Sequence, residues 1–359
     1  MTRPIEALIN LNALQHNLIQ TKKIVGQSRV WAVIKANGYG HGLLRVAKAL
    51  NQADGFAVAS VEEAVTLRQA GFLHPILLLE GLFDAAELRL VLQHRLDIVI
   101  HSQHQLDWLL SDTIEDPIHI WLKLDTGMHR LGFNDEGLHQ ALFRLKHHAP
   151  HFKCHLMSHL ACAEQVHSLN QYQHQQLITA NERYQYSLSL ANSAAIQTAP
   201  HTHLNWVRPG IMLYGAGILK PHTQNFKPVM TLVSRVIAIK WIAEGEGVGY
   251  GQTWQATRKT CLAIVAVGYG DGYPRHAENG TPVVINKIRC PLVGRVSMDM
   301  ITVDITDHAN DIHLNDPVEL WGEQLSVDEV AHHANTIGYE LLCGITQRVK
   351  IKELTQDAI

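Results

Sequence analysis

The sequence predicts an α/β fold class: a (β/α)8 barrel of the TIM type followed by a mostly β C-terminal domain. First, short apolar runs alternate with amphipathic stretches from residue 29 to about residue 215. Second, these runs number eight and are separated by helical patterns, as in a parallel barrel. Third, the pattern changes near residue 220, where Gly, Pro and Asp begin to separate the apolar runs and helical patterns become rare.

The eight strands of the predicted barrel are short and mostly apolar. They are expected at Arg29 to Ile34, Gly55 to Ala59, Pro75 to Leu79, Leu96 to Ile100, Ile118 to Leu124, Phe152 to Met157, Leu188 to Ala191, and a run through Val207 and Ile211 to Tyr214. Helices are expected at Leu43 to Asn51, Val61 to Ala70, from Asp84 onward, and at His104 to Leu110, Glu136 to His148 and Asn170 to Gln185. Ser60 with Glu63 three residues later is the pattern of a capping box, so Ser60 is expected to cap its helix. An open doubly wound sheet is the alternative, but no G-x-G-x-x-G motif with a correctly spaced acidic residue follows a strand.

The last part of the chain is predicted to be a β domain of about 130 residues. Residues 220–225 resemble a connector. Strands are expected at Val229 to Trp241, Thr260 to Val267, Pro282 to Ile288 and Ile301 to Ile305, and a helix at Val327 to Ile337. We therefore expect a barrel domain at 1–225, whose first residues are free to pack with the β domain, and the β domain at 226–359.

Composition argues against several classes of partner. A net charge of -3 gives no reason to expect nucleic acid or a membrane surface. The five cysteines are widely spaced and form no C-x-x-C pair, which favours a cytoplasmic protein over a disulfide framework. His151, His155 and His159 recur at four-residue spacing, but the apolar run at 152–157 favours a strand, so no metal site is expected there.

The stretch Val30-Trp31-Ala32-Val33-Ile34-Lys35 places a lysine at the end of a buried strand, before a glycine-rich turn. Barrels carry their ligands at the carboxyl ends of the strands. A buried lysine is destabilised in its charged form, so its amine becomes a nucleophile suited to a Schiff base. The alternative is a strand-end lysine that simply reaches solvent.

Other predicted strand ends also carry reactive residues. They are Tyr39 after strand one, Arg130 after strand five, His159 after strand six, Ser193 after strand seven, and Arg208 with Gly210 around strand eight. A barrel brings all these ends to one mouth. Each residue alone has an ordinary structural explanation, but their common location favours a site.

These motifs closely resemble those of the bacterial alanine racemases. The similar segments are Ala32-Val33-Ile34-Lys35-Ala36-Asn37-Gly38-Tyr39-Gly40-His41-Gly42, Lys123 to Gly132, Ala191-Asn192-Ser193, Arg208 to Gly215, Val267 to Arg275, and Gly294 to Met300. They occur in the family's order along essentially the whole chain, which makes the resemblance specific.

The resemblance implies pyridoxal 5'-phosphate as cofactor, bound by a Schiff base to Lys35. Its phosphate would be held by Tyr39, Ser193 and the backbone of Gly210 and Ile211, and hydroxyl groups with free N–H groups suit a dianion. The family often has a tyrosine phosphate contact where this sequence has Gln347. That last contact is therefore open.

The resemblance also assigns the residues that would move protons. Arg208 would face the pyridine nitrogen, and because a guanidinium has no acceptor to offer, the ring would stay unprotonated, which suits racemisation over transamination. Lys35 would serve one face of the substrate carbon and Tyr269, from the other subunit of a homodimer, would serve the opposite face. A phenol is a weak base at neutral pH, so His159 is expected to bridge Tyr269 and Arg208 and extend the positive field to the phenol.

Four further positions follow from the same resemblance. Arg130 would bind the substrate carboxylate, because its planar fork matches a planar anion. Lys123 is a candidate carbamylation site, where a carbamate would hold Arg130 in place. Met298 and Asp299 would cross over from the second subunit to line the substrate entrance.

The activity implied is interconversion of L- and D-alanine, supplying peptidoglycan precursors or serving D-alanine catabolism. Three alternatives stay open: a racemase of broader amino-acid range, a pyridoxal-phosphate decarboxylase of the same design, and a non-enzymatic binding protein. The Gly268 to Tyr273 segment argues against the decarboxylase, and the complete second domain argues against the binding protein.

Overall fold

The computed structural model describes residues 3–111, 114, 116–219, 222 and 225–354. Eight parallel strands close into a barrel in the order β2 to β9. They are β2 (Arg29–Val33), β3 (Gly55–Val58), β4 (Ile76–Leu78), β5 (Asp97–Ile100), β6 (His119–Lys123), β7 (Lys153–Met157), β8 (Leu188–Asn192) and β9 (Trp206–Arg208). The predicted barrel is confirmed, and the open-sheet alternative is wrong because β9 pairs with β2.

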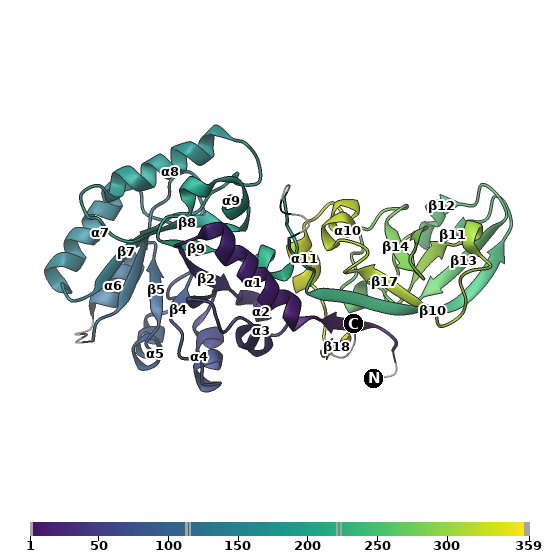
Figure 1. Ribbon diagram of the computed structural model, residues 1–359, viewed down its shortest axis with the longest axis horizontal. Coiled ribbons are helices and arrows are strands. Elements are labelled where there is room, and N and C mark those ends of the chain that lie inside the picture. Colours follow the sequence, from purple (N-terminus) through teal and green to yellow (C-terminus); the bar gives the residue numbers. More distant parts are fainter. Residues whose placement is uncertain (1–2, 112–113, 115, 220–221, 223–224, 355–359) are drawn as a thin grey trace.

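Helices surround the barrel (Figure 1). They are α3 (Leu43–Ala49), α4 (Val61–Gln69), α5 (Leu88–His94), α6 (Gln103–Ser111), α7 (Asp135–His148), α8 (Ser168–Asn181) and α9 (Ser193–Thr198), with α1 (Leu11–Val25) preceding β2. The predicted eighth strand is too long, because only β9 is extended and Ile211–Tyr214 forms a 3-10 turn, η3. Since no long helix follows β9 directly, α1 packs against α3, α9 and η3 and completes the ring from the amino-terminal side.

Three tryptophans fill the floor of the barrel. Trp31 stacks on Trp206 with 4.4 Å between ring centroids, and Trp121 meets both rings edge-on. A Cβ on Gly55 would lie 2.2 Å from the Trp31 ring, so this strand position requires glycine. The amino-terminal end of the barrel is thus a packed core, as is usual for the fold.

The second domain is a twisted, mostly antiparallel sheet. Its path runs β15 (Ile288–Pro291), β14 (Pro282–Ile285), β17 (Pro317–Trp321), β10 (Met230–Ile242), β1 (Glu6–Ile9) and β18 (Lys350–Glu353), while β13 (Thr260–Val265) pairs with β10 and with β16 (Ile301–Asp304). The small hairpin β11 (Gly247–Val248) and β12 (Trp254–Gln255) lies at its far end, and α10 (Val327–His333) and α11 (Gly338–Cys343) follow β17 (Figure 1). Because β1 lies between β10 and β18, the first strand of the chain belongs to the sheet of the β domain.

Two local predictions need correction. Ser60 occupies the N-cap position of α4, but its side chain makes no capping hydrogen bond. Glu63 instead accepts from the N–H groups of Ala59 and Asn37, which ties α4 to the turn after β2.

The run predicted as one strand at 282–288 is a hairpin, with Asn286 and Lys287 at positive φ in its turn. Most of the connector predicted at 220–225 lies outside the described residues.

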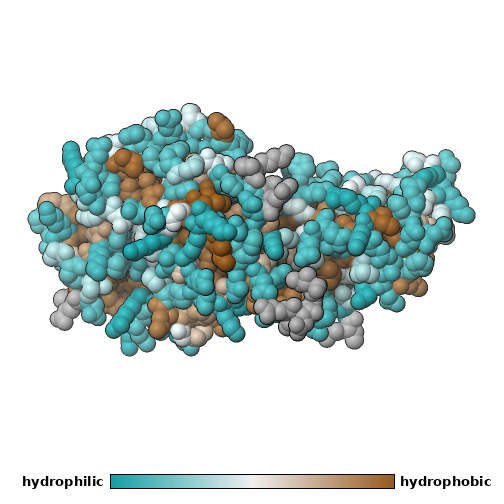
Figure 2. Space-filling view, viewed as in Figure 1, coloured by the Kyte–Doolittle hydropathy of each residue, from teal (hydrophilic) through white to brown (hydrophobic). Residues whose placement is uncertain are grey.

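The face of the molecule in Figure 2 is mostly hydrophilic, with apolar side chains in small separate groups. Within the described residues, no helix is both long and apolar enough to cross a membrane.

Candidate active site

Lys35 lies two residues after the end of β2 and begins a turn of left-handed backbone conformation. Ala36, Asn37, Gly38 and Tyr39 all have φ between 51° and 62°, which is the left-handed region. Non-glycine residues adopt this conformation at a cost of roughly 1–2 kcal/mol each. Such strain persists only where neighbouring contacts fix it, and it concentrates at functional sites.

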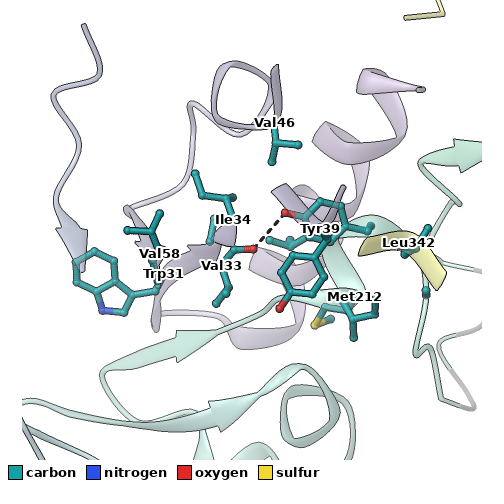
Figure 3. Close-up of a cluster of buried hydrophobic side chains, with 14 of the residues drawn as sticks. Trp31, Val33, Ile34, Tyr39, Val46, Val58, Met212 and Leu342 are labelled. Carbon is teal, nitrogen blue, oxygen red and sulfur yellow. Dashed lines mark hydrogen bonds between the residues drawn. The ribbon is translucent and has the colours of Figure 1, made fainter. Parts of the chain in front are cut away.

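The contacts that fix this turn are specific. The Asn37 side chain accepts from the Leu43 N–H at 2.9 Å, and the His41 ring nitrogen Nδ1 lies 2.8 Å from the Tyr39 carbonyl oxygen and 3.1 Å from that of Gly38. A Cβ on Gly40 would lie 2.2 Å from the carbonyl oxygen of Leu342 in α11, so the second domain presses directly on the turn. Figure 3 shows Tyr39 in a cluster of buried side chains that includes Val33, Met212 and Leu342.

The Lys35 amine is more exposed than the sequence predicted. Its side chain is 38% exposed, and Nζ lies 3.9 Å from the Glu80 carboxylate, which follows β4. The predicted burial of Lys35 is therefore wrong, because the side chain leaves the strand end and points to the open mouth of the barrel. The alternative of a strand-end lysine reaching solvent describes its exposure correctly.

Arg208 lies at the end of β9 and is buried beneath the mouth. Its guanidinium donates to the Ser189 hydroxyl, to the Ser158 carbonyl oxygen at 2.6 Å and to the Leu190 carbonyl oxygen at 3.3 Å. Burial lowers the pKa of Arg208 to about 10, so the group is still cationic at neutral pH. Nη2 also lies 3.3 Å from Nδ1 of His159.

His159 is neutral at physiological pH. Burial, followed by the positive charges of Arg208 and Lys123, holds the pKa of His159 well below its usual range. Since a guanidinium only donates, Nδ1 of His159 must accept, and the remaining ring proton is then on Nε2.

Lys123 is the last residue of β6, and Arg130 lies in the loop that follows this strand. Asp125 Oδ1 accepts from the N–H groups of Gly127, Met128 and His129, which curls this loop and leaves Arg130 exposed at the mouth. Lys123 is buried, and this burial, with the charges of Arg208 and Arg130, lowers the pKa of Lys123 to about 8.

A cluster of hydroxyl and backbone N–H groups lies where β8 and β9 end, and β9 pairs with the strand that leads to Lys35. Ser193 Oγ accepts from the N–H of Gly210 at 2.9 Å and from that of Met212 at 3.4 Å, which directs its own hydrogen elsewhere. A Cβ on Gly210 would lie 2.4 Å from the Tyr39 hydroxyl oxygen, so glycine is needed for this approach. Burial raises the pKa of Tyr39, so its phenol remains protonated and able to donate.

The structure thus brings one set of predicted residues together and leaves a second set apart. Lys35, Tyr39, Lys123, Arg130, His159, Ser193, Arg208, Gly210 and Ile211 all lie at the carboxyl ends of the barrel strands. Tyr269, Met298 and Asp299 lie together in the β domain, where the Tyr269 N–H donates to the Ser297 carbonyl oxygen and the Gly270 N–H to that of Met298. Among the described residues, Tyr269 makes no hydrogen bond to His159 or Arg208.

Sequence reasoning missed three neighbours of the site. Glu80 directly follows a predicted strand, so its position at the mouth could have been found from the barrel pattern. Ser189 is a polar residue within an apolar strand, and it meets Arg208. Tyr339 of α11 lies beside Tyr39, with 5.9 Å between ring centroids, and nothing local in the sequence indicates this contact. Gln347, whose contact to the phosphate the sequence left open, is exposed.

The fold and the site together define a two-domain barrel protein with a lysine, an arginine and a phenol converging on the barrel mouth. The alanine racemase N-terminal domain model matches residues 9–217, and the alanine racemase C-terminal domain model matches residues 229–352. An alanine racemase of Stutzerimonas stutzeri is 47% identical over 352 residues, covering 97% of this chain and 98% of that protein. The crystal structure of the biosynthetic alanine racemase of Pseudomonas aeruginosa is 44% identical with a TM-score of 0.95, covering 99% of this chain and 100% of that one. The alanine racemase structure of Acinetobacter baumannii is 40% identical with a TM-score of 0.93, covering 98% and 100%. This chain belongs to the alanine racemase family.

Protonation of His41 is predicted to weaken the fold in acid. Burial lowers the pKa of His41 from 6.5 to about 4. The unfolded state therefore binds more protons between these values, and the free energy of unfolding falls as the pH falls, by up to about 3 kcal/mol. Replacing the imidazole by an amide (His41→Asn) should flatten the pH dependence measured by urea unfolding between pH 6.5 and 4.

The comparison must be made between the two proteins rather than on one curve. Burial raises the pKa of Asp97 to about 7, so Asp97 acts in the opposite sense over the same range, but it is present in both proteins and cancels in the difference. Parallel curves for the wild type and His41→Asn would contradict the assignment.

Proposed function

We propose that the chain racemises alanine with pyridoxal 5'-phosphate bound at the barrel mouth through Lys35. The observation that carries this proposal is the convergence of Lys35, Tyr39, Ser193 and Arg208 on one end of the barrel, in a chain of the alanine racemase family. When bound, the cofactor would withdraw electrons from the substrate Cα and make its hydrogen acidic.

The residues present fit this cofactor. The Tyr39 phenol and the Ser193 hydroxyl both have a hydrogen to donate to a phosphate. Because Gly210 has no side chain, the backbone at this residue can lie close to both hydroxyl groups. We propose Gly210 and Ile211 as backbone phosphate contacts as well, although the Gly210 N–H is directed at Ser193 Oγ in this structure. Arg208 would face the ring nitrogen as a permanent donor, which disfavours protonation of that nitrogen.

The substrate carboxylate would be bound by Arg130, whose guanidinium is exposed at the mouth. Lys35 Nζ would take or return a proton on one face of Cα. The Tyr269 hydroxyl would do so on the opposite face, and the Nε2 proton of His159 would stabilise the phenolate that results. Met298 and Asp299 would border the route by which alanine enters.

We propose that Tyr269 acts on the site of a second subunit in a homodimer. The side chains of Tyr269, Met298 and Met300 are 40%, 51% and 44% exposed, and they lie on adjoining backbone segments of the β domain. Apolar side chains that gather on one surface favour a protein interface.

We also propose that the barrel domain ends at residue 225 and the β domain begins at residue 226. We propose that the protein works in the cytoplasm, since its five cysteines are unpaired in the structure.

A racemase of broader range is the second candidate, because Arg130 and Lys35 recognise groups common to all amino acids. A panel of amino acids assayed by chiral chromatography distinguishes the two. Inversion of alanine alone supports the first proposal, and comparable rates with larger side chains support the second.

Removal of the Lys35 amine is predicted to abolish both cofactor linkage and turnover. Lys35→Ala should lower the rate of D-alanine racemisation at least about a thousandfold, because it removes both the covalent anchor and one proton carrier. The exposed lysine of α3 provides a matched control, Lys48→Ala, which should retain wild-type activity and visible absorbance. Full activity in Lys35→Ala would exclude the proposed role.

Mixing two inactive variants tests whether Tyr269 is supplied by a second subunit. Tyr269→Phe should bind the cofactor but racemise poorly. In a mixed dimer with Lys35→Ala, one site contains both substitutions and the other contains neither. Subunits that exchange at random should therefore regain about a quarter of wild-type activity. If mixing restores nothing while mass measurement shows mixed dimers, Tyr269 does not act across subunits.

Lys123 is predicted to carry a carbamate. With its pKa lowered to about 8, roughly a tenth of Lys123 is neutral at pH 7, far more than for an ordinary lysine. This amine can attack the carbon of CO2, forming an N–C bond and releasing one proton, and the resulting anion would offset the surrounding cations. Native mass spectrometry in bicarbonate should find the mass of one CO2 on the wild type and not on Lys123→Met. An unmodified wild type under these conditions would contradict the carbamate.

A further inference from the structure

The loop that carries Tyr269 rests on a buried carboxylate. Asp271, two residues after Tyr269 in the 3-10 turn η6 (Tyr269–Asp271), is completely buried. Its Oδ2 accepts from the Gly268 N–H at 3.0 Å and from Nη2 of Arg3 at 2.8 Å. Its Oδ1 lies 3.2 Å from Nε of Arg348. A buried carboxylate is stable only when hydrogen bonds and opposite charges offset its loss of hydration, and Arg3 and Arg348 supply these charges to Asp271.

The same two arginines also hold Asp299. Nη2 of Arg348 donates to Asp299 Oδ1, while Arg3 lies 3.8 Å from that oxygen and donates to the Asp299 carbonyl oxygen at 3.1 Å. Arg3, Asp271, Asp299 and Arg348, which we term the arginine–aspartate network, thus join the start of the chain, two loops of the β domain and the segment before β18.

Backbone contacts make this assembly rigid around Tyr269. The N–H groups of Tyr269 and Gly270 donate to carbonyl oxygens of the 297–300 segment at 3.1 and 2.9 Å. The Thr346 hydroxyl donates to the Gly270 carbonyl oxygen at 2.9 Å. A Cβ on Gly268 would lie 2.3 Å from the Met298 carbonyl oxygen, and one on Gly270 would lie 2.3 Å from Nη1 of Arg348. The Tyr269 backbone is therefore clamped between two segments, while its side chain faces outward.

We infer that Arg3 and Arg348 are positioning residues for Tyr269, acting through Asp271 and Asp299. This inference rests on the proposed function, since it assigns the network to the proton carrier of that reaction. The phenol belongs to a loop of three residues between glycines, which has little stiffness of its own. The network supplies that stiffness, and it fixes Met298 and Asp299 of the entrance in the same frame. Misplacing a proton carrier by about 1 Å can cost up to about a hundredfold in rate.

The test replaces each half-buried arginine singly, so that Asp271 always retains one cationic partner. We expect Arg3→Gln and Arg348→Gln to lower kcat for alanine about tenfold with little change in KM, and Arg348→Lys, which keeps charge but loses the fork, to fall between. In D2O, exchange of the alanine Cα hydrogen on the face served by Tyr269 should slow more than exchange on the face served by Lys35.

A second measurement does not depend on catalysis. The amides of Gly268, Tyr269 and Gly270 are all hydrogen-bonded, so hydrogen–deuterium exchange of a peptide spanning 268–273 should accelerate severalfold in the arginine variants. A peptide spanning 35–42, at the cofactor turn, should exchange at the wild-type rate. The control is Arg258→Gln, which breaks the exposed Arg258–Asp307 ion pair of the same domain and should alter neither peptide nor kcat.

Three results would overturn the inference. The first is unchanged exchange at 268–273 in both arginine variants. The second is an equal acceleration of exchange in both peptides, and the third is dissociation of the dimer, because the arginines would then support the fold or the assembly rather than Tyr269. Failure of the proposed function is a separate result, since it would appear as absence of racemisation by the wild-type protein itself.

Discussion

The left-handed turn after β2 is the constraint on which the rest of the site depends. Three non-glycine residues, Ala36, Asn37 and Tyr39, are held at positive φ, and their combined strain is of the order of several kcal/mol. An extended or right-handed continuation of β2 would place Tyr39 elsewhere and separate it from Gly210. The hydrogen bonds of Asn37, Glu63 and His41 therefore serve to keep Lys35 and Tyr39 at one end of the barrel.

The second domain takes part in this constraint. α11 contacts the turn through Leu342 and Tyr339, while β1 ties the beginning of the chain into the sheet of the β domain. The barrel mouth is thus shaped by elements from both ends of the sequence. A change in α11, far from Lys35 in the sequence, is therefore expected to disturb the turn after β2 without touching the barrel strands.

The barrel was predictable because each strand is a short apolar run in a regular alternation, and strand ends converge whatever the side chains are. Lys35, His159 and Arg208 could be located on that basis alone. β1 and α1 were not identified, because β1 has only four residues and its partners, β10 and β18, lie more than two hundred residues away. The exposure of Lys35 was mispredicted since it depends on how far the mouth opens. The Arg3–Asp271 contact spans 268 positions and has no local signal at all.

The mouth of the barrel carries more positive than negative side chains, and its acidic residues offset the repulsion only in part. Lys35, Lys123, Arg130 and Arg208 all depress the pKa of His159, whereas Glu80 and Asp125 are the acidic groups that act on Lys123. As a result His159 is neutral, and the pKa of Lys123 is lowered. A site with this excess of positive charge favours anions, and a phosphate, a substrate carboxylate and a carbamate would each reduce the repulsion. The same excess keeps Nδ1 of His159 an acceptor, which leaves the Nε2 proton to be directed at whatever oxygen approaches from outside the barrel. Under the proposed function, the phenolate of Tyr269 is the group that this proton, together with the charge of Arg208, would stabilise.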